Sequence, residues 1–528
     1  MKLPALIILL CTFNFVLASD KYPVNGNLNV TQYEFSVYLS DSYDMIRGEA
    51  FIRISHTGPS PVIMLDLTGL KEDGKGMVVE RLTLNEEEVE WVHVGNELII
   101  TPETPREKGE TSRILINYFG VPGDGLIISQ NRYGDRTFFA DNWPDRARNW
   151  IPCIDHPSDK APVDFKVYAP SHYKVVSNGH LVEESILNEG IKLTHWKEEV
   201  SIPTRVMVIG AARFAARLAG RVGGTEIWSY VYPEDRENGF NDYSLAVKPF
   251  TFFSEQIGSY SYEKLANVQS KTIFGGMENA GCIFYSERSV TGKGESERLM
   301  AHEIAHQWFG NSVTEKDWNH IWLSEGFATY FTAYYQGSVY GEPKLRSIML
   351  LARNRVMSAY ERNPAPVVDT TITDLMDLLS TYSYQKGAWV LHMLRSELGD
   401  GLFMHGISTF YSRYRNRNAL TSDFRNTMEE ISGRDLDQFF NQWLYLEEIP
   451  DLEISWTYSP RRREVIMLVE QVQPGNAFRF PLDIEILTEG DRVLESVEID
   501  EKTERLTFRA DSRPTEINLD PDVKLLYH

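Results

Sequence analysis

The sequence predicts a multidomain α+β protein with an N-terminal antiparallel β domain, a mostly α-helical middle domain and a small C-terminal β-sandwich. Its 528 residues exceed the size of one typical domain. Short β-rich runs fill residues 33–214, helical periodicity dominates from about residue 240 to Trp443, and strand-like alternation returns past Pro450. A segment at residues 1–19 precedes the domains. The expected domains span residues 20–214, 215–448 and 449–528.

The N-terminal domain is predicted from strands that recur at short intervals. Turn residues such as Ser177-Asn178-Gly179 separate them, and this spacing is typical of a large antiparallel sheet. The clearest runs are residues 37–39, 50–54, 98–101, 113–118 and 174–176.

The two later domains are predicted from changes in the spacing of apolar residues along the sequence. A late helix is expected to begin at a cap formed by Thr421 or Ser422 and to end at Gly433. Beyond it, apolar residues alternate at 452–456 and 482–486, with turns at 474–476 and 489–491. This pattern predicts a sandwich of about 80 residues.

The first 19 residues resemble a secretory signal peptide. Lys2 is followed by apolar runs, and Val16-Leu17-Ala18 ends on small-residue spacing. Lipid attachment at Cys11 and a retained anchor helix are alternatives, although Leu10 is bulky for the first and the apolar run is short for the second. The expected location is therefore secreted or periplasmic, with a lipid-anchored form less favoured.

Charge and cysteine content exclude several classes of protein. The formal net charge of −22 argues against nucleic acid as a partner. No later stretch is apolar enough to cross a bilayer, so no transmembrane span is expected in the mature chain. Apart from Cys11, only Cys153 and Cys282 occur, and free buried thiols are favoured over a disulfide framework.

One short motif carries metal chemistry. His302 and His306 flank Glu303 in a segment with helical periodicity, and residues four apart lie on the same face of a helix. Glu325 follows at the start of a second predicted helix and can supply a third ligand. Two histidines and one glutamate match a catalytic Zn²⁺ site with one open position, where bound water has a pKa near 7. The sequence predicts one Zn²⁺ per chain and Glu303 as the general base.

A second motif lies upstream, at Gly275-Gly276-Met277-Glu278-Asn279. Together with the His-Glu-x-x-His segment and Glu325, which follows His306 by 19 residues, it resembles the paired signatures of the gluzincin zinc aminopeptidases related to aminopeptidase N and leukotriene-hydrolase. The resemblance implies a thermolysin-like catalytic domain. It also implies an enzyme that removes N-terminal amino acids from peptides by attack of a metal-activated water.

The resemblance also implies roles for individual residues. Glu278 would bind the free α-amino group of the peptide, a charge-assisted contact between a carboxylate and an ammonium. Tyr384, in a segment similar to the family's Tyr-x-Lys-Gly, would donate to the oxyanion, with Tyr382 as a nearby competitor. The implied substrate-binding segment consists of Gly275, Gly276, Met277, Glu278 and Asn279.

The chain departs from the family pattern in two places. Trp143 stands where members commonly carry a Gln or Glu that makes a second contact to the substrate amine, and Asp141 or Asn142 could replace that contact. The chain also resembles a short form that lacks the large C-terminal helical domain of many members.

Three hypotheses follow for the function. The leading one is a zinc aminopeptidase acting on peptides with a free N-terminal amine. An endopeptidase is the second, because two histidines and a glutamate do not by themselves fix where a peptide is cut. A catalytically silent peptide-binding protein is the third, and epoxide hydrolysis, known in one branch of the family, has no positive sign here.

Overall fold

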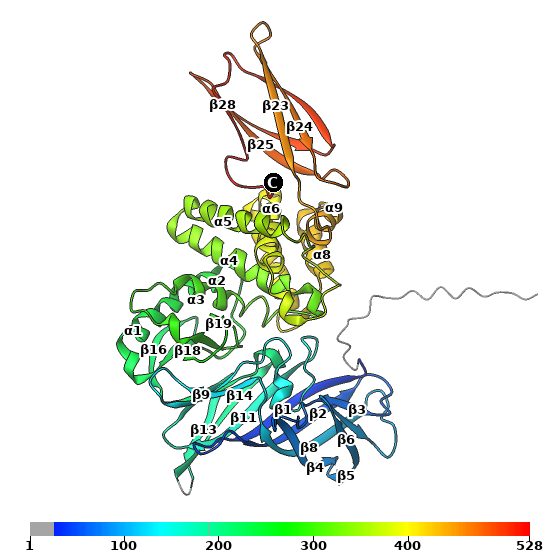
Figure 1. Ribbon diagram of the computed structural model, residues 1–528, viewed down its shortest axis with the longest axis vertical. Helices are drawn as coiled ribbons and strands as arrows, with labels where there is room; N and C mark the ends of the chain where they lie inside the picture. The colour runs from blue at the N-terminus through cyan, green and yellow to red at the C-terminus, as the bar shows by residue number, and fades with distance from the viewer. Residues whose placement is uncertain (1–25, 188–189) are drawn as a thin grey trace, which may run out of the picture.

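The computed structural model describes residues 26–187 and 190–528. Figure 1 shows a β-rich N-terminal part, a helical middle part and a β-rich C-terminal part that follow one another along the longest axis. The proposed signal peptide lies outside the described residues. No helix within the described ranges is long and apolar enough to cross a membrane.

The N-terminal part is built on a large sheet with the strand order β13-β14-β11-β1-β2-β8-β4-β5. Along β2, buried and exposed residues alternate, so one face of the strand packs on the core. The strands in chain order are β1 Leu28–Tyr38, β2 Ile46–His56, β4 Gly76–Leu84, β5 Glu87–Glu88, β8 Thr111–Val121, β11 Lys160–Pro170, β13 His180–Ile186 and β14 Ile191–Pro203.

Two smaller sheets complete this part, with the orders β12-β15-β10-β9 and β3-β7-β6. Their strands are β3 Ile63–Asp66, β6 Glu90–Val94, β7 Glu97–Thr101, β9 Leu126–Gln130, β10 Arg136–Ala140, β12 Lys174–Ser177 and β15 Ile209–Ala212. All five runs named in the sequence analysis fall on strands, apart from Leu39, which follows β1 directly.

The expectation of an antiparallel N-terminal domain is wrong at one point. β1 and β11 pair in parallel, for example at Tyr33 and Val163, although the other pairs of the large sheet are antiparallel. Alternation of apolar residues shows which face of a strand is buried, but it carries no information about strand direction.

The middle part begins with a mixed sheet that the sequence pattern did not predict. Its order is β16-β17-β18-β20-β19, and β19 lies at its edge. The inner strand β18 is buried along its whole length, so it has no alternation to recognise. The strands are β16 Ala215–Val222, β17 Thr225–Val231, β18 Lys264–Ser270, β19 Gly276–Met277 and β20 Cys282–Ser286.

Helices form the rest of the middle part (Figure 1). Two short strands, β21 Thr314–Glu315 and β22 Asn418–Ala419, pair between them. The helices are α1 Arg236–Tyr243, α2 Val247–Gln256, α3 Glu297–Ala305, α4 Trp322–Tyr340, α5 Glu342–Tyr360, α6 Gly387–Leu398, α7 Asp400–Tyr414, α8 Thr421–Ser432 and α9 Asp437–Phe440.

The two predicted caps of α8, Thr421 and Ser422, are wrong by one and two residues. The helix begins at Thr421, so the cap position is Leu420, whose backbone N–H donates to Asp423 Oδ2 at 2.8 Å. Gly433 ends the helix as expected, in the left-handed conformation with φ 67°. Leucine has no side-chain acceptor, and the acidic side chain in the first turn satisfies the orphan N–H instead.

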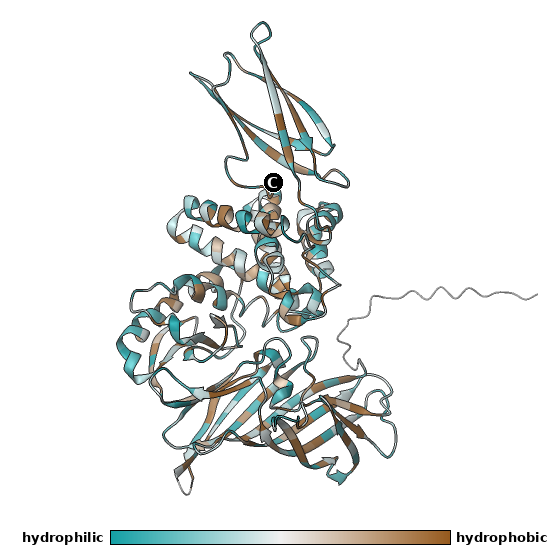
Figure 2. Ribbon diagram, viewed as in Figure 1, coloured by the Kyte–Doolittle hydropathy of each residue, from teal (hydrophilic) through white to brown (hydrophobic). Residues whose placement is uncertain are grey.

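Beyond Pro450 the chain forms two antiparallel sheets with the orders β23-β24-β27 and β26-β25-β28. Val465, Met467 and Val469 of the first sheet and Leu482, Ile484 and Ile486 of the second are buried and belong to one apolar cluster with the helical part. Apolar and polar residues alternate along these strands in Figure 2. The strands are β23 Leu452–Ser459, β24 Glu464–Gln471, β25 Phe480–Leu487, β26 Arg492–Ile499, β27 Thr503–Arg509 and β28 Glu516–Leu519.

Both remaining cysteines are free and buried, as predicted. Cys153 lies at 0% exposure in the core of the N-terminal part, and Cys282 lies on β20. Burial raises the pKa of Cys153 well above its usual value and that of Cys282 to about 11. Both thiols are therefore protonated and inert at neutral pH.

Candidate active site

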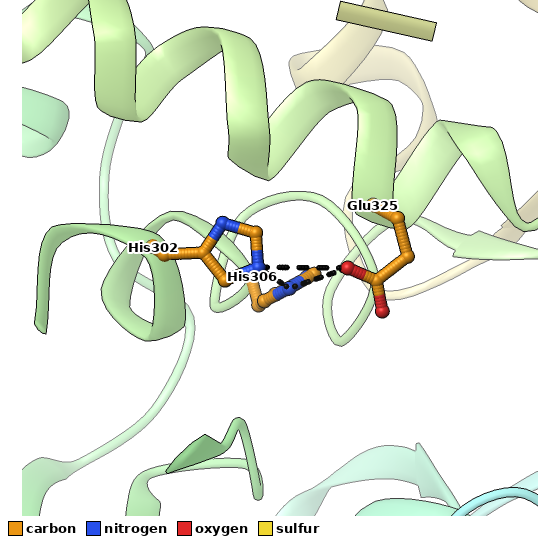
Figure 3. Close-up of side chains that lie close together, drawn as sticks. All are labelled: His302, His306 and Glu325. Atoms are coloured by element: carbon orange, nitrogen blue, oxygen red, sulfur yellow. Dashed lines mark hydrogen bonds and ion pairs between the residues drawn. The ribbon is translucent and has the colours of Figure 1, made fainter. Parts of the chain in front are cut away.

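The three predicted ligands meet between helices α3 and α4. His302 and His306 lie one turn apart at the end of α3, and Glu325 lies in the first turn of α4 (Figure 3). Glu325 Oε2 is 3.5 Å from Nε2 of His302 and 3.3 Å from Nε2 of His306, and the two Nε2 atoms are 3.2 Å apart. Three donor atoms from two helices therefore converge on one point.

These separations fit a zinc ion. Donors placed about 2.1 Å from an ion at tetrahedral angles lie about 3.4 Å from one another. The observed separations are 3.2–3.5 Å. Two imidazole nitrogens and one carboxylate oxygen are also the donor types that zinc prefers in catalytic sites.

A second layer of contacts orients His306. Its Nδ1 lies 3.2 Å from the carbonyl oxygen of Phe309 and 3.0 Å from Ser324 Oγ. Because a carbonyl only accepts, Nδ1 carries a proton, so Nε2 is the nitrogen that can give up its proton and bind a metal. Gly310 makes room for this arrangement, since a Cβ there would lie 2.3 Å from Ser324 Oγ.

The buried ligand side chains shift one another's pKa values. Burial opposes ionisation of Glu325, but the two imidazoles outweigh it and lower the pKa of this carboxyl. Burial lowers the pKa of His302, which keeps its imidazole neutral. Glu325 raises the pKa of His306 to about 9 against the effect of burial, so a metal that binds at neutral pH displaces a proton.

Glu303 lies beside the ligands on α3 and lines the same cavity. It is buried, and burial raises its pKa well above the usual value. Gly276 on the edge strand β19 packs directly against it, because a Cβ on Gly276 would lie 2.4 Å from Glu303 Oε1. A carboxyl with a raised pKa at this place is suited to accept and return a proton.

The structure distinguishes Tyr384 from its competitor Tyr382. Tyr384 lines the cavity, and its ring stacks on His302 with centroids 6.0 Å apart. Burial raises the pKa of Tyr384 well above its usual value, so the phenol stays a donor. Tyr382 points elsewhere and donates to the Asn363 carbonyl at 2.6 Å.

Two glycines allow Tyr384 to come this close to the ligands. Tyr384 lies in the π-helical turn Tyr382–Lys386, which leads into α6. A Cβ on Gly326 of α4 would lie 3.1 Å from the backbone of Gly387 at the start of α6. The glycine of each motif therefore serves helix packing rather than chemistry.

Glu278 lines the cavity on the side of β19, and a buried arginine holds its carboxylate. Arg205 Nη1 is 3.0 Å from Glu278 Oε1, and Arg205 Nη2 is 2.9 Å from the Gly310 carbonyl and 3.1 Å from Glu315. Arg205 and Glu315 are both fully enclosed, at 1% and 0% exposure. One guanidinium thus ties Glu278 to the loop that follows α3 and to β21.

The backbone of Glu278 is fixed from the metal helix as well. Gln307 Nε2 donates to the Glu278 carbonyl at 2.7 Å, and Asn311 Nδ2 donates to the same oxygen at 2.5 Å. Gln307 Oε1 also accepts from the Gly281 N–H at 2.9 Å. The spacing between Glu278 and the ligands is therefore set by side chains immediately after His306.

The other predicted substrate-binding residues lie at different depths. Gly275, Gly276 and Met277 line the cavity. A Cβ on Gly275 would meet only Leu299 Cδ1, at an ordinary 3.8 Å, so this glycine is not required by the space around it. Asn279 is fully buried and does not belong to the cavity lining.

Trp143 lines the cavity, whereas the two residues before it, Asp141 and Asn142, do not. Asp141 pairs with Arg146 at 2.7 Å and accepts from the Thr272 hydroxyl and the Ile273 N–H. The expectation that Asp141 or Asn142 could contact a substrate amine is therefore wrong.

Asn142 is engaged in the same way, with its amide donating to two backbone carbonyls and accepting from Trp150 Nε1. Both polar side chains satisfy buried partners and have no reach into the cavity.

Sequence reasoning missed several residues around the site. Arg205 had no signal, because an isolated arginine 73 residues before Glu278 forms no pattern. Gln307, Gly310 and Asn311 follow the His-Glu-x-x-His segment directly, so two amides and a glycine at the end of the ligand helix could have indicated them.

Comparison with known families covers both the N-terminal and the helical part. The family model described as "Peptidase M1 N-terminal domain" matches residues 29–206, and that described as "Peptidase family M1 domain" matches residues 242–443. Together the two matches cover well over half of the chain.

Curated relatives are aminopeptidases of greater length. The chain is 28% identical over 370 residues to "Glutamyl aminopeptidase" of Bos taurus, an alignment that covers 66% of this chain and 38% of the relative. It is 27% identical over 393 residues to "Probable aminopeptidase 2" of Sulfurisphaera tokodaii, covering 71% and 49%. The chain thus spans half or less of the length of these relatives.

Solved structures share the fold. An M1 zinc metallopeptidase from Deinococcus radiodurans aligns with TM-score 0.67 at 24% identity, over 80% of this chain and 95% of the other. Legionella pneumophila aminopeptidase A in complex with aspartic acid aligns with TM-score 0.81 at 17% identity, over 95% and 59%. With both family models matched and the signature residues gathered in one cavity, the chain belongs to peptidase family M1, the gluzincin aminopeptidase family.

Proposed function

We propose that this protein is a zinc-dependent aminopeptidase that removes N-terminal amino acids from peptides. The observation that carries the proposal is that Glu278 shares one cavity with Glu303, Tyr384 and the three ligand residues. A carboxylate that binds an ammonium at this place limits cleavage to the first peptide bond.

The chain's own residues have distinct roles in this proposal. His302, His306 and Glu325 would hold one Zn²⁺, which when bound would supply a Lewis acid that polarises the carbonyl and makes water nucleophilic at neutral pH. Glu303 takes a proton from the attacking water and returns it to the leaving amine. Tyr384 donates from its phenol to the oxygen on which negative charge develops.

Placement of the substrate depends on the wall of the cavity formed by Glu278 and β19. Glu278 binds the α-ammonium with the carboxylate that Arg205 orients. The edge strand β19, with Gly276 and Met277, offers backbone groups along which an extended peptide can lie. Since Gly276 touches Glu303, the peptide backbone is guided to the general base.

The endopeptidase hypothesis remains the main rival. It requires a cleft that binds peptide residues on both sides of the cleaved bond. Glu278, held in place by a buried ion pair, puts a negative charge on one of these sides and so opposes an extended peptide there. The silent-binder hypothesis requires the loss of a ligand, the base or the tyrosine, and all of these residues are present in the cavity.

The experiment is hydrolysis of aminoacyl anilides with a free or an acetylated amine, before and after chelation and zinc restoration. The series includes glutamate, because the bovine relative is named glutamyl aminopeptidase. Cleavage of the free-amine set alone, lost with the chelator and regained with zinc, is expected. Cleavage of acetylated substrates would favour the endopeptidase, and silence of zinc-loaded protein would favour the binder.

We propose the domain boundaries 20–214, 215–448 and 449–528, with the last domain a β-sandwich. The two antiparallel sheets past Pro450 and their buried facing residues support this assignment. A secreted or periplasmic location is proposed from the signal-like residues 1–19. N-terminal sequencing of the exported protein tests it, with a mature end after Ala18 or Ser19 expected.

A further inference from the structure

The cavity beside the metal ligands is lined by acidic and apolar side chains. It measures about 260 Å³. Its charged residues other than the histidines are the acids Glu278, Glu303 and Glu325, and no lysine or arginine lines it among the described residues. Its apolar lining consists of Trp143, Phe274, Met277, Leu299 and Leu379.

Trp143 makes one wall both apolar and rigid. The indole is 2% exposed and packs edge-to-face on Phe274 and on Trp318, with centroids 6.1 Å apart in each case. It stands where the resemblance led us to expect an amide or a carboxylate. The contacts with two other rings hold the indole in place at the cavity wall.

The guanidinium of Arg146 lies next to this wall, and its nitrogens are already hydrogen-bonded. It lies over the Phe274 ring, 5.7 Å from the centroid. Its Nε donates to the Trp143 carbonyl at 2.6 Å, Nη1 to Asp124 at 3.0 Å and Nη2 to Asp141 at 2.7 Å. Each nitrogen already has a hydrogen-bond acceptor and Arg146 does not line the cavity, so the cation is not available to a substrate.

The geometry limits where the first side chain of a peptide can go. The α-ammonium is held at Glu278 and the carbonyl lies by Glu303 and Tyr384, so the intervening Cα directs its side chain at the remaining walls. These walls are apolar. A carboxylate placed there would lose its hydration without gaining a cation from the cavity lining.

We propose that this cavity selects peptides whose N-terminal side chain is apolar and uncharged, such as methionine, leucine or phenylalanine, and rejects N-terminal aspartate and glutamate. This preference rests on the proposed aminopeptidase function and deepens it. Trp143, Phe274 and Leu379 are the residues assigned to the selection.

The test compares kcat/KM for the free-amine anilides of methionine, glutamine and glutamate, which have similar length and differ in polarity and charge. Methionine is expected to exceed glutamate by about 100-fold or more, with glutamine between them. Glutamate cleaved within a few-fold of methionine would overturn the proposal.

A charge-introducing variant locates the preference on the wall. Leu379→Arg adds a cation to the cavity and is expected to raise the glutamate-to-methionine ratio of kcat/KM at least 10-fold. Met376→Arg is the matched control, because Met376 lies on the short 3-10 helix Leu375–Leu378 that directly precedes Leu379, is 41% exposed and does not line the cavity. An equal shift in both variants would contradict the assignment of Leu379.

A binding measurement tests the side-chain preference even if the proposed aminopeptidase activity is absent. If no anilide is cleaved, the aminopeptidase proposal fails, and calorimetry with methioninamide and with the α-amide of glutamate then decides the preference. Tighter binding of methioninamide to zinc-loaded protein supports the apolar selection. Equal or tighter binding of the glutamate amide overturns it.

Discussion

Arg205 Nη1 lies 3.0 Å from Glu278 Oε1, and both side chains are buried. The guanidinium also contacts Glu315 and the Gly310 carbonyl, so it links the proposed amine anchor to the loop behind the metal helix. Burial opposes the charge of Arg205, but Glu315 and Glu278 outweigh it and raise its pKa. The anchor therefore has a fixed, permanently charged partner.

Arg205→Met should raise KM for free-amine substrates at least 10-fold while kcat changes less, because Glu278 loses its orientation but the ligands and base remain. Unfolding should also become easier by about 3–5 kcal/mol, since two buried carboxylates lose their partner. Arg205→Lys keeps the positive charge but loses the planar, forked guanidinium. Its KM and its stability should therefore lie between those of wild type and Arg205→Met.

Steady-state kinetics and thermal unfolding check this prediction. Arg353→Met is the control, because Arg353 pairs with the buried Asp520 at 3.3 Å away from the cavity. It should lower Tm without raising KM. Loss of kcat at unchanged KM in Arg205→Met would rule out the positioning role.

Glu303→Gln should reduce kcat about 10²- to 10⁴-fold and leave zinc content unchanged, since the amide fills the same space but accepts no proton. Zinc is measured by elemental analysis and turnover with a leucine anilide. Glu297→Gln on the same helix is the control, because Glu297 accepts from Tyr335 and Tyr340 outside the cavity. Activity within 10-fold of wild type would refute the assignment of the base.

Tyr384→Phe should lower kcat about 10²- to 10³-fold with little change in KM, because the phenol donates to charge that develops only in the transition state. Tyr382→Phe, in the same π-helical turn, should keep its activity, since its hydroxyl donates to Asn363. Comparable losses in both variants would point to a folding defect of the turn instead.

Metal removal should abolish hydrolysis and lower Tm, because an ion bound only by the folded ligand set stabilises that state. Zinc restoration should recover both, with one zinc per chain at saturation. His306→Ala should lose the metal, whereas His172→Ala, at a histidine 39% exposed, should keep it. Zinc content that is the same in both variants would contradict the ligand assignment.

Asp159→Asn should make stability less dependent on pH. Burial raises the pKa of Asp159 from 3.8 to about 7, opposed by the Val30 N–H that Oδ2 accepts at 3.1 Å. The stabilising contribution is full below pH 3.8 and is lost as pH rises through 7. By pH 8 the ionised carboxylate costs about 4 kcal/mol.

The Tm difference between Asp159→Asn and wild type should therefore grow in favour of the variant from pH 5 to pH 8. Asp377→Asn, at an exposed aspartate, is the control and should shift Tm equally at both values. A constant difference for Asp159→Asn would show that its carboxyl does not titrate in this range.

The sequence alone determined what short-range geometry dictates. A spacing of four residues places His302 and His306 on one helical face, and apolar periodicity located α3, α4 and the runs of strand. The family resemblance added Glu278 and Tyr384, which share the cavity with the ligands. These features depend on neighbours within a few turns of the chain or on a contiguous motif.

Only the tertiary structure decided what depends on distant contacts. It paired Arg205 with Glu278, set β1 parallel to β11, chose Tyr384 over Tyr382 for the cavity, and made Trp143 a wall of it while Asp141 turned away. Each outcome results from long-range packing and from the need of buried polar groups for partners, and a linear pattern contains neither.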